Sequence, residues 1–396
     1  MIHYFIILLR YCIMYINCDG QPQQRCEMSS LQCTFLLFIL CIMHLGCCAP
    51  QNNGKAADAT TASISSVNNP TGIETYSAAE MCEKYSELIY VTLKNPILLV
   101  DNEDSYIKFK DCHDVLPLIV NGTLANPKEF PHMALLGYGQ SPKDNFWGCG
   151  GSLISNRWIL SAAHCEKYTD SEYVRWARLG ELNYLTDTDD ARPKDYKIVQ
   201  RVIHPNYKKP MLYNDIALFR LEEDVTFSPY VRPICLNADP YMQSTTPQKV
   251  IATGWGQISQ GWFVLLGFES YLPMTVFNNK SCTGSLSPDL LKVILDVTPA
   301  TQCKSNYASA AKSQLPNGIL NDSQMCAGYA SGQKDTCTGD SGGPIQIPHS
   351  KYSCMYKQVG VTSFGKKCAE QNSPGVYTRV SNYLPWIEQI VWPKSD

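Results

Sequence analysis

From Leu118 onward, the sequence alternates between short apolar segments and turn residues. The apolar segments are rich in β-branched and aromatic residues, and examples lie at 158–161, 197–203, 217–221 and 359–364. Short strands separated by turns in this way are typical of an all-β barrel. The pattern therefore predicts an all-β fold for the larger, C-terminal part of the chain.

Cysteine content indicates the environment of this fold. The 396 residues include eighteen cysteines, which is many for a cytosolic protein of this size. Metal binding is the alternative, but CxxC pairs do not recur at the spacing of zinc fingers. We therefore expect disulfide bonds and a secreted, extracellular protein.

Charge and composition exclude some classes of partner. The net charge is −3, and no basic stripe interleaved with aromatic residues is present, so we expect no nucleic-acid partner. Charged residues make up 17% of the chain and hydrophobic residues 44%, which indicates a packed globular body.

A candidate nucleophile lies near the C-terminus. The segment 335–344, Asp-Thr-Cys-Thr-Gly-Asp-Ser-Gly-Gly-Pro, places Ser341 between glycines that can turn tightly and direct N–H groups at a developing oxyanion. A serine hydroxyl needs a base, and the base needs an orienting group. His164 in Leu-Ser-Ala-Ala-His-Cys and Asp215 in Asn-Asp-Ile-Ala-Leu supply both. The order His, Asp, Ser predicts a serine hydrolase.

These three contexts together resemble the chymotrypsin-like (S1) serine proteases, over roughly residues 119–391. The resemblance implies a double six-stranded antiparallel β-barrel with a C-terminal helix, and no required cofactor. It implies that Ser341 is the nucleophile, His164 the general base and later acid, and Asp215 the group that fixes the imidazole tautomer. The N–H groups of Gly339 and Ser341 would form the oxyanion hole.

The same resemblance implies a substrate class. Asp335, six residues before Ser341, matches the pocket base of the trypsin-like branch, where a carboxylate pairs with a substrate Lys or Arg. Gly365 and Gly375 match the glycines of the pocket walls. Residues from Ser363 to Gly365 would offer an edge strand to the extended substrate backbone. We expect cleavage after Lys or Arg.

The segment 118–122, Leu-Ile-Val-Asn-Gly, resembles the activation site of this family. Cleavage before Ile119 would free an amine that pairs with the carboxylate of Asp340 and orders the oxyanion loop. Because Leu118 precedes the cleaved bond, an enzyme that prefers Lys or Arg would activate itself poorly. The resemblance therefore implies a zymogen and a separate activating protease that cuts between Leu118 and Ile119.

Finer similarities point to one branch of this family. Leu118 and the segments 130–137, 335–341 and 362–366 are similar to the snake-type clip proteases of arthropods. This likeness implies a middle position in an extracellular cascade of the Toll or prophenoloxidase kind. The substrate would be another protease zymogen, and a serpin-type inhibitor is a further expected partner.

Resemblance also implies disulfide pairs. It pairs Cys149 with Cys165, Cys303 with Cys326, Cys337 with Cys368, and Cys112 with Cys235, which would tie the propeptide to the catalytic domain. After removal of a signal peptide, Cys82, Cys282 and Cys354 are left over. A bridge between Cys82 and Cys354 is a hypothesis that requires Cys282 to be absent from the mature protein.

The first fifty residues contain two apolar runs, 2–16 and 33–46, and both are shorter than the roughly 20 residues of a membrane span. The second follows a polar stretch after Met28 and precedes small residues, so it has the character of a signal peptide. We expect translation to start at Met28, with 1–27 an upstream extension, and cleavage to fall near Ala49.

A clip domain is the competing interpretation of the same region. That module has six cysteines, of which the last two are adjacent. The same pattern is formed here by Cys18, Cys26, Cys33, Cys41, Cys47 and Cys48. The apolar residues between Cys33 and Cys41 suit a small disulfide knot poorly, because it could not bury them. We therefore favour residues 1–49 as a signal region. Under both interpretations, a linker and propeptide follow at 50–118 and a peptidase domain at 119–396. Within the propeptide, 79–89 has the spacing of a short amphipathic helix lying on the protease body.

One segment departs from the family. Residues 258–282 are additional and hydrophobic, and are either a long surface insertion or an error of gene assembly. We favour the error, because exposure of 262–268 would create an apolar patch. Two rival functions stay open. The first is a non-catalytic protease homologue that acts as a binding protein, and the second is a membrane-anchored or structural cysteine-rich protein.

Other motifs predict modification or metal binding. Asn121, Asn279 and Asn321 fit the N-glycosylation pattern, and we expect Asn321 to be the acceptor. Oxygen ligands that could hold calcium cluster in one loop, at Glu181, Asn183, Asp187, Asp189 and Asp190. We favour an acidic surface loop without a metal there.

Overall fold

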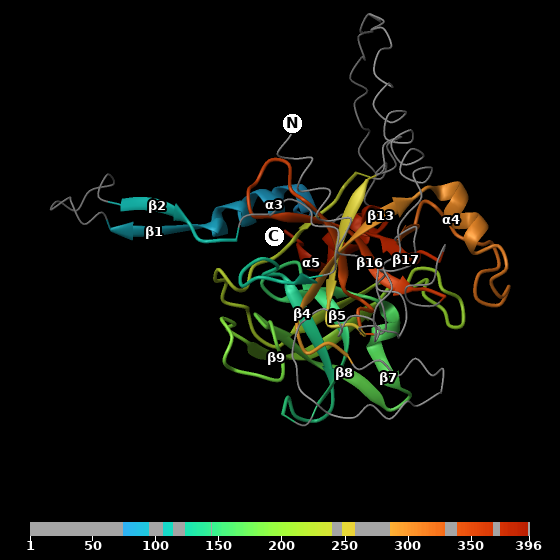
Figure 1. Cartoon of the computed structure of the whole chain (residues 1–396), viewed down its shortest axis with the longest axis horizontal. Coiled ribbons are helices and arrows are strands. Elements are labelled where there is room, and N and C mark those ends of the chain that lie inside the picture. Colours follow the sequence, from blue (N-terminus) through green and yellow to red (C-terminus); the bar gives the residue numbers. More distant parts are fainter. Residues whose placement is uncertain are drawn as a thin grey trace, which may run out of the picture. The chain divides into compact units, whose positions relative to one another are not determined.

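The computed structural model describes residues 74–94, 106–113, 123–143, 145–239, 248–257, 286–328, 339–366 and 373–394. Within these ranges most residues of regular structure lie in antiparallel strands, and the helices are short (Figure 1). None of the helices in the described ranges is long and apolar enough to cross a membrane.

Six strands close the first barrel. In spatial order they are β4 (Met133–Tyr138), β5 (Phe146–Leu153), β6 (Trp158–Ser161), β10 (Ala217–Leu221), β9 (Lys194–Ile203) and β8 (Glu172–Leu179). The barrel closes because β4 pairs with β8 as well as with β5, and β7 (Lys167–Thr169) extends β8 as a short hairpin. Closure leaves no free edge among these six strands.

A second six-stranded barrel follows in the chain. Its strands, in spatial order, are β12 (Lys249–Gly254), β13 (Leu291–Thr298), β14 (Gln324–Gly328), β17 (Gly375–Arg379), β16 (Tyr356–Phe364) and β15 (Pro344–Pro348). Pairing of β15 with β12 closes it, and the short strands β11 (Cys235–Leu236) and β3 (Thr123–Leu124) add to β16 and β13. The predicted chymotrypsin-like double barrel is confirmed, and the four apolar segments of the sequence lie in β6, β9, β10 and β16.

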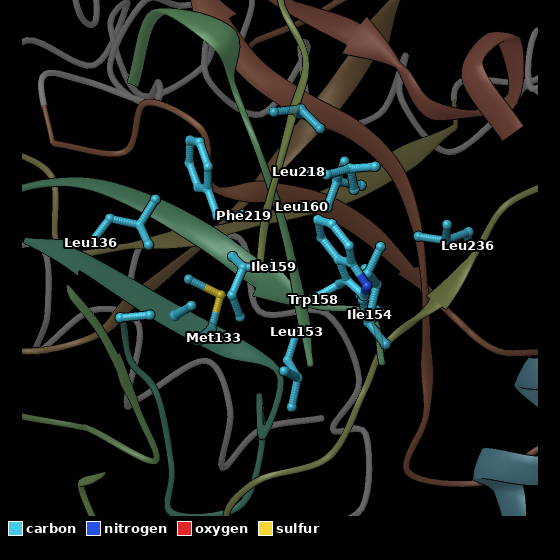
Figure 2. Close-up of a cluster of buried hydrophobic side chains, with 14 of the residues drawn as sticks. Met133, Leu136, Leu153, Ile154, Trp158, Ile159, Leu160, Leu218, Phe219 and Leu236 are labelled. Carbon is cyan, nitrogen blue, oxygen red and sulfur yellow. The ribbon is translucent and has the colours of Figure 1, made fainter. Parts of the chain in front are cut away.

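The core of the first barrel is formed by large aliphatic and aromatic side chains from β4, β5, β6 and β10 (Figure 2). Leu153, Ile159, Leu160, Leu218 and Phe219 each have 0% of their surface exposed. Burial of a side chain of this kind contributes about 1.5–3 kcal/mol, so this core holds the strands that carry the candidate site in place.

The helices in the described ranges are short. They are α3 (Ala78–Ser86) with η1 (Glu87–Ile89), η3 (Ala163–Glu166), α4 (Ala300–Asn306), and η5 (Val380–Tyr383) with α5 (Leu384–Val391). The last of these is the predicted C-terminal helix. Pro385 at its start suits the first turn of a helix, where the missing N–H costs no hydrogen bond.

Helix α3 forms the predicted amphipathic segment and lies on the protease body. It starts with a capping box between Ser77 and Glu80, and it buries Ala78, Cys82 and Tyr85. The backbone N–H of Ala78 donates to Glu388 Oε1 at 2.7 Å. After α3, the strands β1 (Tyr90–Lys94) and β2 (Tyr106–Lys110) form a separate two-stranded sheet.

The disulfides correct two of the expected pairings. The structure contains Cys149–Cys165 and Cys303–Cys326, as the resemblance implies. However, Cys235 is bonded to Cys82 and Cys112 to Cys354, so the pairing of Cys112 with Cys235 is wrong, and so is that of Cys82 with Cys354.

The physical reason is the position of α3, which packs against β11 and brings the Cα atoms of Cys82 and Cys235 to 5.0 Å. The residue Asp111 is held near the loop of Cys354 by Arg232, which donates to its carbonyl, and by Lys128, which pairs with its carboxylate at 2.7 Å. Cys337, Cys368 and Cys282 lie outside the described residues.

A buried histidine at the start of β4 makes stability depend on pH. His132 is 2% exposed, its Nε2 lies 2.7 Å from Gln346 Oε1, and burial lowers its pKa from 6.5 to about 4. Between those values the unfolded chain binds a proton that the folded chain excludes, so stability falls as pH drops from about 6.5 towards 4.

We expect the free energy of unfolding to fall by about 2 kcal/mol between pH 7 and pH 5 through this residue. Urea unfolding of a Ser341→Ala background, which prevents self-digestion, measures the change. His132→Gln keeps a donor towards Gln346 but cannot titrate here, so the variant should show a shallower dependence on pH. An unchanged dependence in that variant would rule out His132 as its source.

Candidate active site

Two residues next to the paired strands β6 and β10 meet at the end of the first barrel. His164 lies on η3, directly after β6, and Asp215 directly precedes the buried Ile216 and β10. The Nδ1 atom of His164 lies 2.8 Å from Asp215 Oδ2, and the backbone N–H of His164 donates to Asp215 Oδ1 at 2.9 Å. Both carboxylate oxygens therefore hold the same histidine in place.

The second barrel completes the surroundings of Asp215, which is only 2% exposed. Ser363 Oγ, near the end of β16, donates to Asp215 Oδ2 at 2.5 Å. Thr378 Oγ1, on β17, donates to the Asp215 carbonyl at 2.8 Å. A buried carboxylate is stable only with such partners, so the site depends on both barrels.

The electrostatics of the pair follow from burial and proximity. Burial alone would lower the pKa of His164, but the charge and hydrogen bond of Asp215 outweigh it, so this pKa lies above its ordinary value. Burial would raise the pKa of Asp215, yet the charge of His164 and the hydrogen bonds of His164 and Ser363 hold it below its ordinary value. The carboxylate is thus ionised at neutral pH and stabilises a protonated imidazole.

Ser341 lies beside this pair, on the turn before β15. Its carbonyl accepts a hydrogen bond from the backbone N–H of Gly150 at 2.8 Å, and Cys165 Sγ lies 3.5 Å from the same oxygen. Because Cys165 follows His164 in the chain and is bonded to Cys149, the disulfide places the serine turn next to the histidine helix. The Ser341 residue is half-buried, so it can be reached from solvent.

The turn around Ser341 uses backbone conformations that favour glycine. Gly339 has φ +100° and Gly342 has φ +78°, both in the left-handed region. A Cβ at Gly339 would lie 2.5 Å from Leu286 Cδ2. Asp340, between them, accepts a hydrogen bond at its Oδ1 from the backbone N–H of Gly256 at 2.9 Å. The candidate oxyanion loop is therefore held from the side of β12.

Substitution of Gly339 should test this loop. We expect Gly339→Ala to lower kcat by about 10²-fold, because displacement of one oxyanion-hole donor costs about 3 kcal/mol. Peptide hydrolysis by the activated protein measures it. Gly180→Ala is the matched control, since Gly180 also has positive φ (+74°) and a crowded Cβ position, 2.6 Å from Arg192 O, but lies at the end of β8. Equal kcat losses in both variants would contradict a specific role of Gly339.

The structure describes some of the other predicted site residues. Gly375 is buried in β17, and Gly365 follows β16 with open space around its Cβ direction. Asp335, Leu118 and Ile119 lie outside the described residues, as do Asn121, Asn279 and the segment 258–282. Asn321 is half-buried, and its carbonyl accepts a hydrogen bond from Arg379.

Two carboxylates of the acidic loop have protein partners. Glu181 is 5% exposed and lies 3.3 Å from Arg178 Nη1, and Asp189 Oδ2 accepts from the backbone N–H of Asn183 at 3.0 Å. Two groups of potential metal ligands do occur in the described ranges, Cys82 with Cys235 and His349, and Cys149 with His164 and Cys165. Their cysteines are joined in disulfides and offer no thiolate.

Two contacts were not predicted from the sequence. Ser363 was expected to pair with substrate backbone, but its hydroxyl contacts Asp215, which is 148 residues away in the chain. Thr378 contacts the same residue from β17. Single serines and threonines in strands carry no signal of such a partner, because only barrel packing brings them to the carboxylate.

Comparison with known proteins agrees with this geometry. The Trypsin family profile matches residues 119–285 and 273–387, which together make up more than half of the chain. The chain belongs to the trypsin family. The two matched segments overlap at residues 273–285, which include the end of the segment 258–282 that was expected to depart from the family.

Three relatives illustrate the similarity. Serine protease snk of Drosophila melanogaster is 42% identical over 287 residues, which are 72% of this chain and 59% of that protein. A venom protease of Bombus pensylvanicus is 38% identical over 269 residues, 67% of this chain and 96% of that protein. Phenoloxidase-activating factor 1 of Holotrichia diomphalia is 33% identical over 290 residues, 69% of this chain and 70% of that protein. The chain thus spans about six tenths of the length of snk.

Proposed function

We propose that this trypsin-family member is the secreted zymogen of a serine endopeptidase that cleaves after Lys or Arg. The observation that carries the proposal is the pair of half-buried His164 and buried Asp215, with Nδ1 and Oδ2 2.8 Å apart, next to the glycine turn of Ser341. This arrangement leaves the other imidazole nitrogen, Nε2, to act on the serine hydroxyl.

Acylation starts when Ser341 Oγ attacks the carbonyl carbon of the substrate while its proton passes to His164 Nε2. The N–H groups of Gly339 and Ser341 stabilise the negative oxygen of the tetrahedral intermediate. His164 then donates its proton to the leaving amine, and the peptide C–N bond breaks. Water repeats the sequence on the acyl-enzyme, with His164 again as base, and releases the new carboxylic acid. Asp215 stabilises the imidazolium in both halves.

Specificity and activation are parts of the same proposal. Asp335 would pair with the substrate Lys or Arg, between walls at Gly365 and Gly375. Cleavage between Leu118 and Ile119 by another protease would free an amine for Asp340. Support comes from the hydrogen bond between Gly256 N–H and Asp340 Oδ1, which holds this carboxylate on the side of β12.

Two disulfides bear on what happens after activation. Cys82–Cys235 and Cys112–Cys354 each join the part before Ile119 to the part after it. The propeptide would therefore remain attached as a light chain, with residues 50–118 held to the domain that starts at 119. Electrophoresis with and without reductant distinguishes an attached from a released propeptide.

Relatives support a place in a proteolytic cascade. Phenoloxidase-activating factor 1 carries an activating role in its name, and snk is described as a serine protease. We propose that the substrate is another protease zymogen in an extracellular cascade of arthropod type, and that a serpin-type inhibitor ends the activity.

The test is controlled activation followed by hydrolysis. Exchange of residues 114–118 for an enteropeptidase recognition sequence permits cleavage before Ile119. The activated protein should hydrolyse peptides with Arg before the cleaved bond and leave matched Phe peptides intact, whereas Ser341→Ala should hydrolyse neither. An activated protein with the correct N-terminus but no hydrolysis would instead support a non-catalytic homologue.

A further inference from the structure

Three stretches of chain around the candidate site carry lysines and no acid. They are 204–214, which precedes Asp215, then 299–321, and then 363–366. Their lysines are Lys208, Lys209, Lys304, Lys312 and Lys366, and none of the three stretches contains Asp or Glu. We call these residues the lysine rim.

The first two stretches are joined by a brace of hydrogen bonds. The backbone N–H of Leu212 donates to Gln314 O at 3.0 Å, and Gln324 Nε2 donates to Leu212 O at 2.9 Å. Tyr213 Oη donates to Gly318 O at 2.8 Å. Leu315, next to Gln314, is also buried, with 2% of its surface exposed. The loop that carries Lys312 is therefore fixed against the segment that carries Lys209.

An aromatic pair joins the third stretch to the second. The rings of Tyr307, just after α4, and Phe364, at the end of β16, meet edge to face with centroids 5.8 Å apart. Lys366 Nζ donates to Asn306 O and lies 5.3 Å from the centroid of the Tyr307 ring. These contacts join all three lysine-bearing stretches, and the Tyr307–Phe364 pair packs between the second and the third.

The charges of the rim are not neutralised within the described residues. All five lysines are exposed, and none lies within 4.0 Å of a carboxylate in the described ranges. Most of the other lysines in the described ranges do have such partners, for example Lys197 with Glu222 and Lys351 with Glu83, each at 3.4 Å. The charge of Lys209 also acts on His164, whose pKa it lowers against the effect of Asp215.

Clustered charges of one sign near a binding site attract ligands of the opposite sign and disfavour those of the same sign. Under the proposed function, the substrate residues that precede the cleaved bond run along Ser363–Gly365, between the lysines of the rim. An anionic segment there would meet several unpaired cations, whereas a basic segment would be repelled.

We infer that the protein substrate carries acidic residues within about five positions before its cleaved Lys or Arg, and that the lysine rim selects them. This inference rests on the proposed function. The inference adds a second requirement to the substrate. The basic residue occupies the pocket, and Asp or Glu residues before it bind to Lys209, Lys312 and Lys366.

Two peptides that differ only in this segment test the inference. Both place Arg before the cleaved bond, and one has two Glu upstream where the other has two Gln. We expect kcat/KM to be about fivefold higher for the Glu peptide at low salt, because each of the two exposed charge pairs should contribute roughly a twofold gain. The ratio should approach one at about 0.5 M NaCl, where the charges are screened.

Variants locate the effect. Lys312→Gln combined with Lys366→Gln should bring the Glu-to-Gln ratio of kcat/KM at low salt close to one. Hydrolysis of the Gln peptide should stay unchanged, which also shows that the variant is folded. The matched control, Lys197→Gln combined with Lys351→Gln, removes two exposed lysines elsewhere and should keep the ratio. A ratio near one in the parent enzyme, or an equal loss in both double variants, would overturn the inference.

Failure of the proposed function gives a different result. If neither peptide is hydrolysed, the endopeptidase proposal is wrong. The affinities of the two peptides for the activated Ser341→Ala protein then decide the inference: preference for the Glu peptide that depends on Lys312 and Lys366 supports it, and equal affinities reject it.

Discussion

Ser341→Ala is expected to lower kcat/KM of the activated protein for an Arg peptide by about 10⁶-fold, to the level that binding and oxyanion stabilisation alone provide. The change removes the oxygen that forms the acyl-enzyme under the proposed function, while the Ser341 carbonyl keeps its contacts with Gly150 N–H and Cys165 Sγ. Initial rates and active-site titration with an acylating inhibitor measure it.

The folded state is the control for this comparison. The variant should unfold at the same urea concentration as the parent at pH 7, because the Ser341 hydroxyl makes no hydrogen bond to a core residue within the described ranges. Ser141→Ala, at a half-buried position in the turn between β4 and β5, is the matched serine control and should keep full activity. Residual activity above about 1% in Ser341→Ala would show that another nucleophile carries the reaction.

Asp215→Asn is expected to lower kcat by about 10⁴-fold at neutral pH. The amide can occupy the same space but presents an N–H to His164 Nδ1 or Ser363 Oγ, so the imidazole is held in the wrong tautomer. It also removes the negative charge that raises the pKa of His164. Rates measured from pH 5 to pH 9 give both effects.

The pH dependence has a definite sign. His164 must be neutral to act as a base, so activity of the parent falls as pH drops through a pKa that lies above the ordinary value of 6.5. Loss of the Asp215 charge should move this fall to lower pH. Asp195→Asn is the matched control, since it removes a carboxylate that pairs with Arg178 on the other side of β9. A shift of the same size in that variant would show that net charge, and not the contact with His164, sets the pKa.

Local signals account for much of what could be predicted. The strands β6, β9, β10 and β16 were found from apolar runs, because a strand that packs against a core needs such residues wherever it lies in the fold. Helix α3 was found from its spacing for the same reason. The residues His164, Asp215 and Ser341 were found because each lies in a short, recognisable context.

The wrong prediction for Cys112 shows what a local sequence pattern cannot supply. A sequence contains no measure of how close two cysteines come, and the pairing of Cys112 with Cys235 was carried over by likeness alone. The packing of α3 on β11 decides that Cys82 reaches Cys235, and the anchoring of Asp111 by Arg232 leads Cys112 to Cys354.

By itself, the sequence determined an all-β chain with a candidate nucleophile, a candidate base and a candidate orienting acid in three separate contexts, since strand periodicity and glycine turns act over a few residues. Only the tertiary structure decided what those contexts become together. Barrel closure buries Asp215 between His164 and Ser363, and packing of Leu212 on Gln314 gathers the lysine rim. These contacts join residues 50 to 150 positions apart, and their geometry depends on how whole strands pack, which no local pattern encodes.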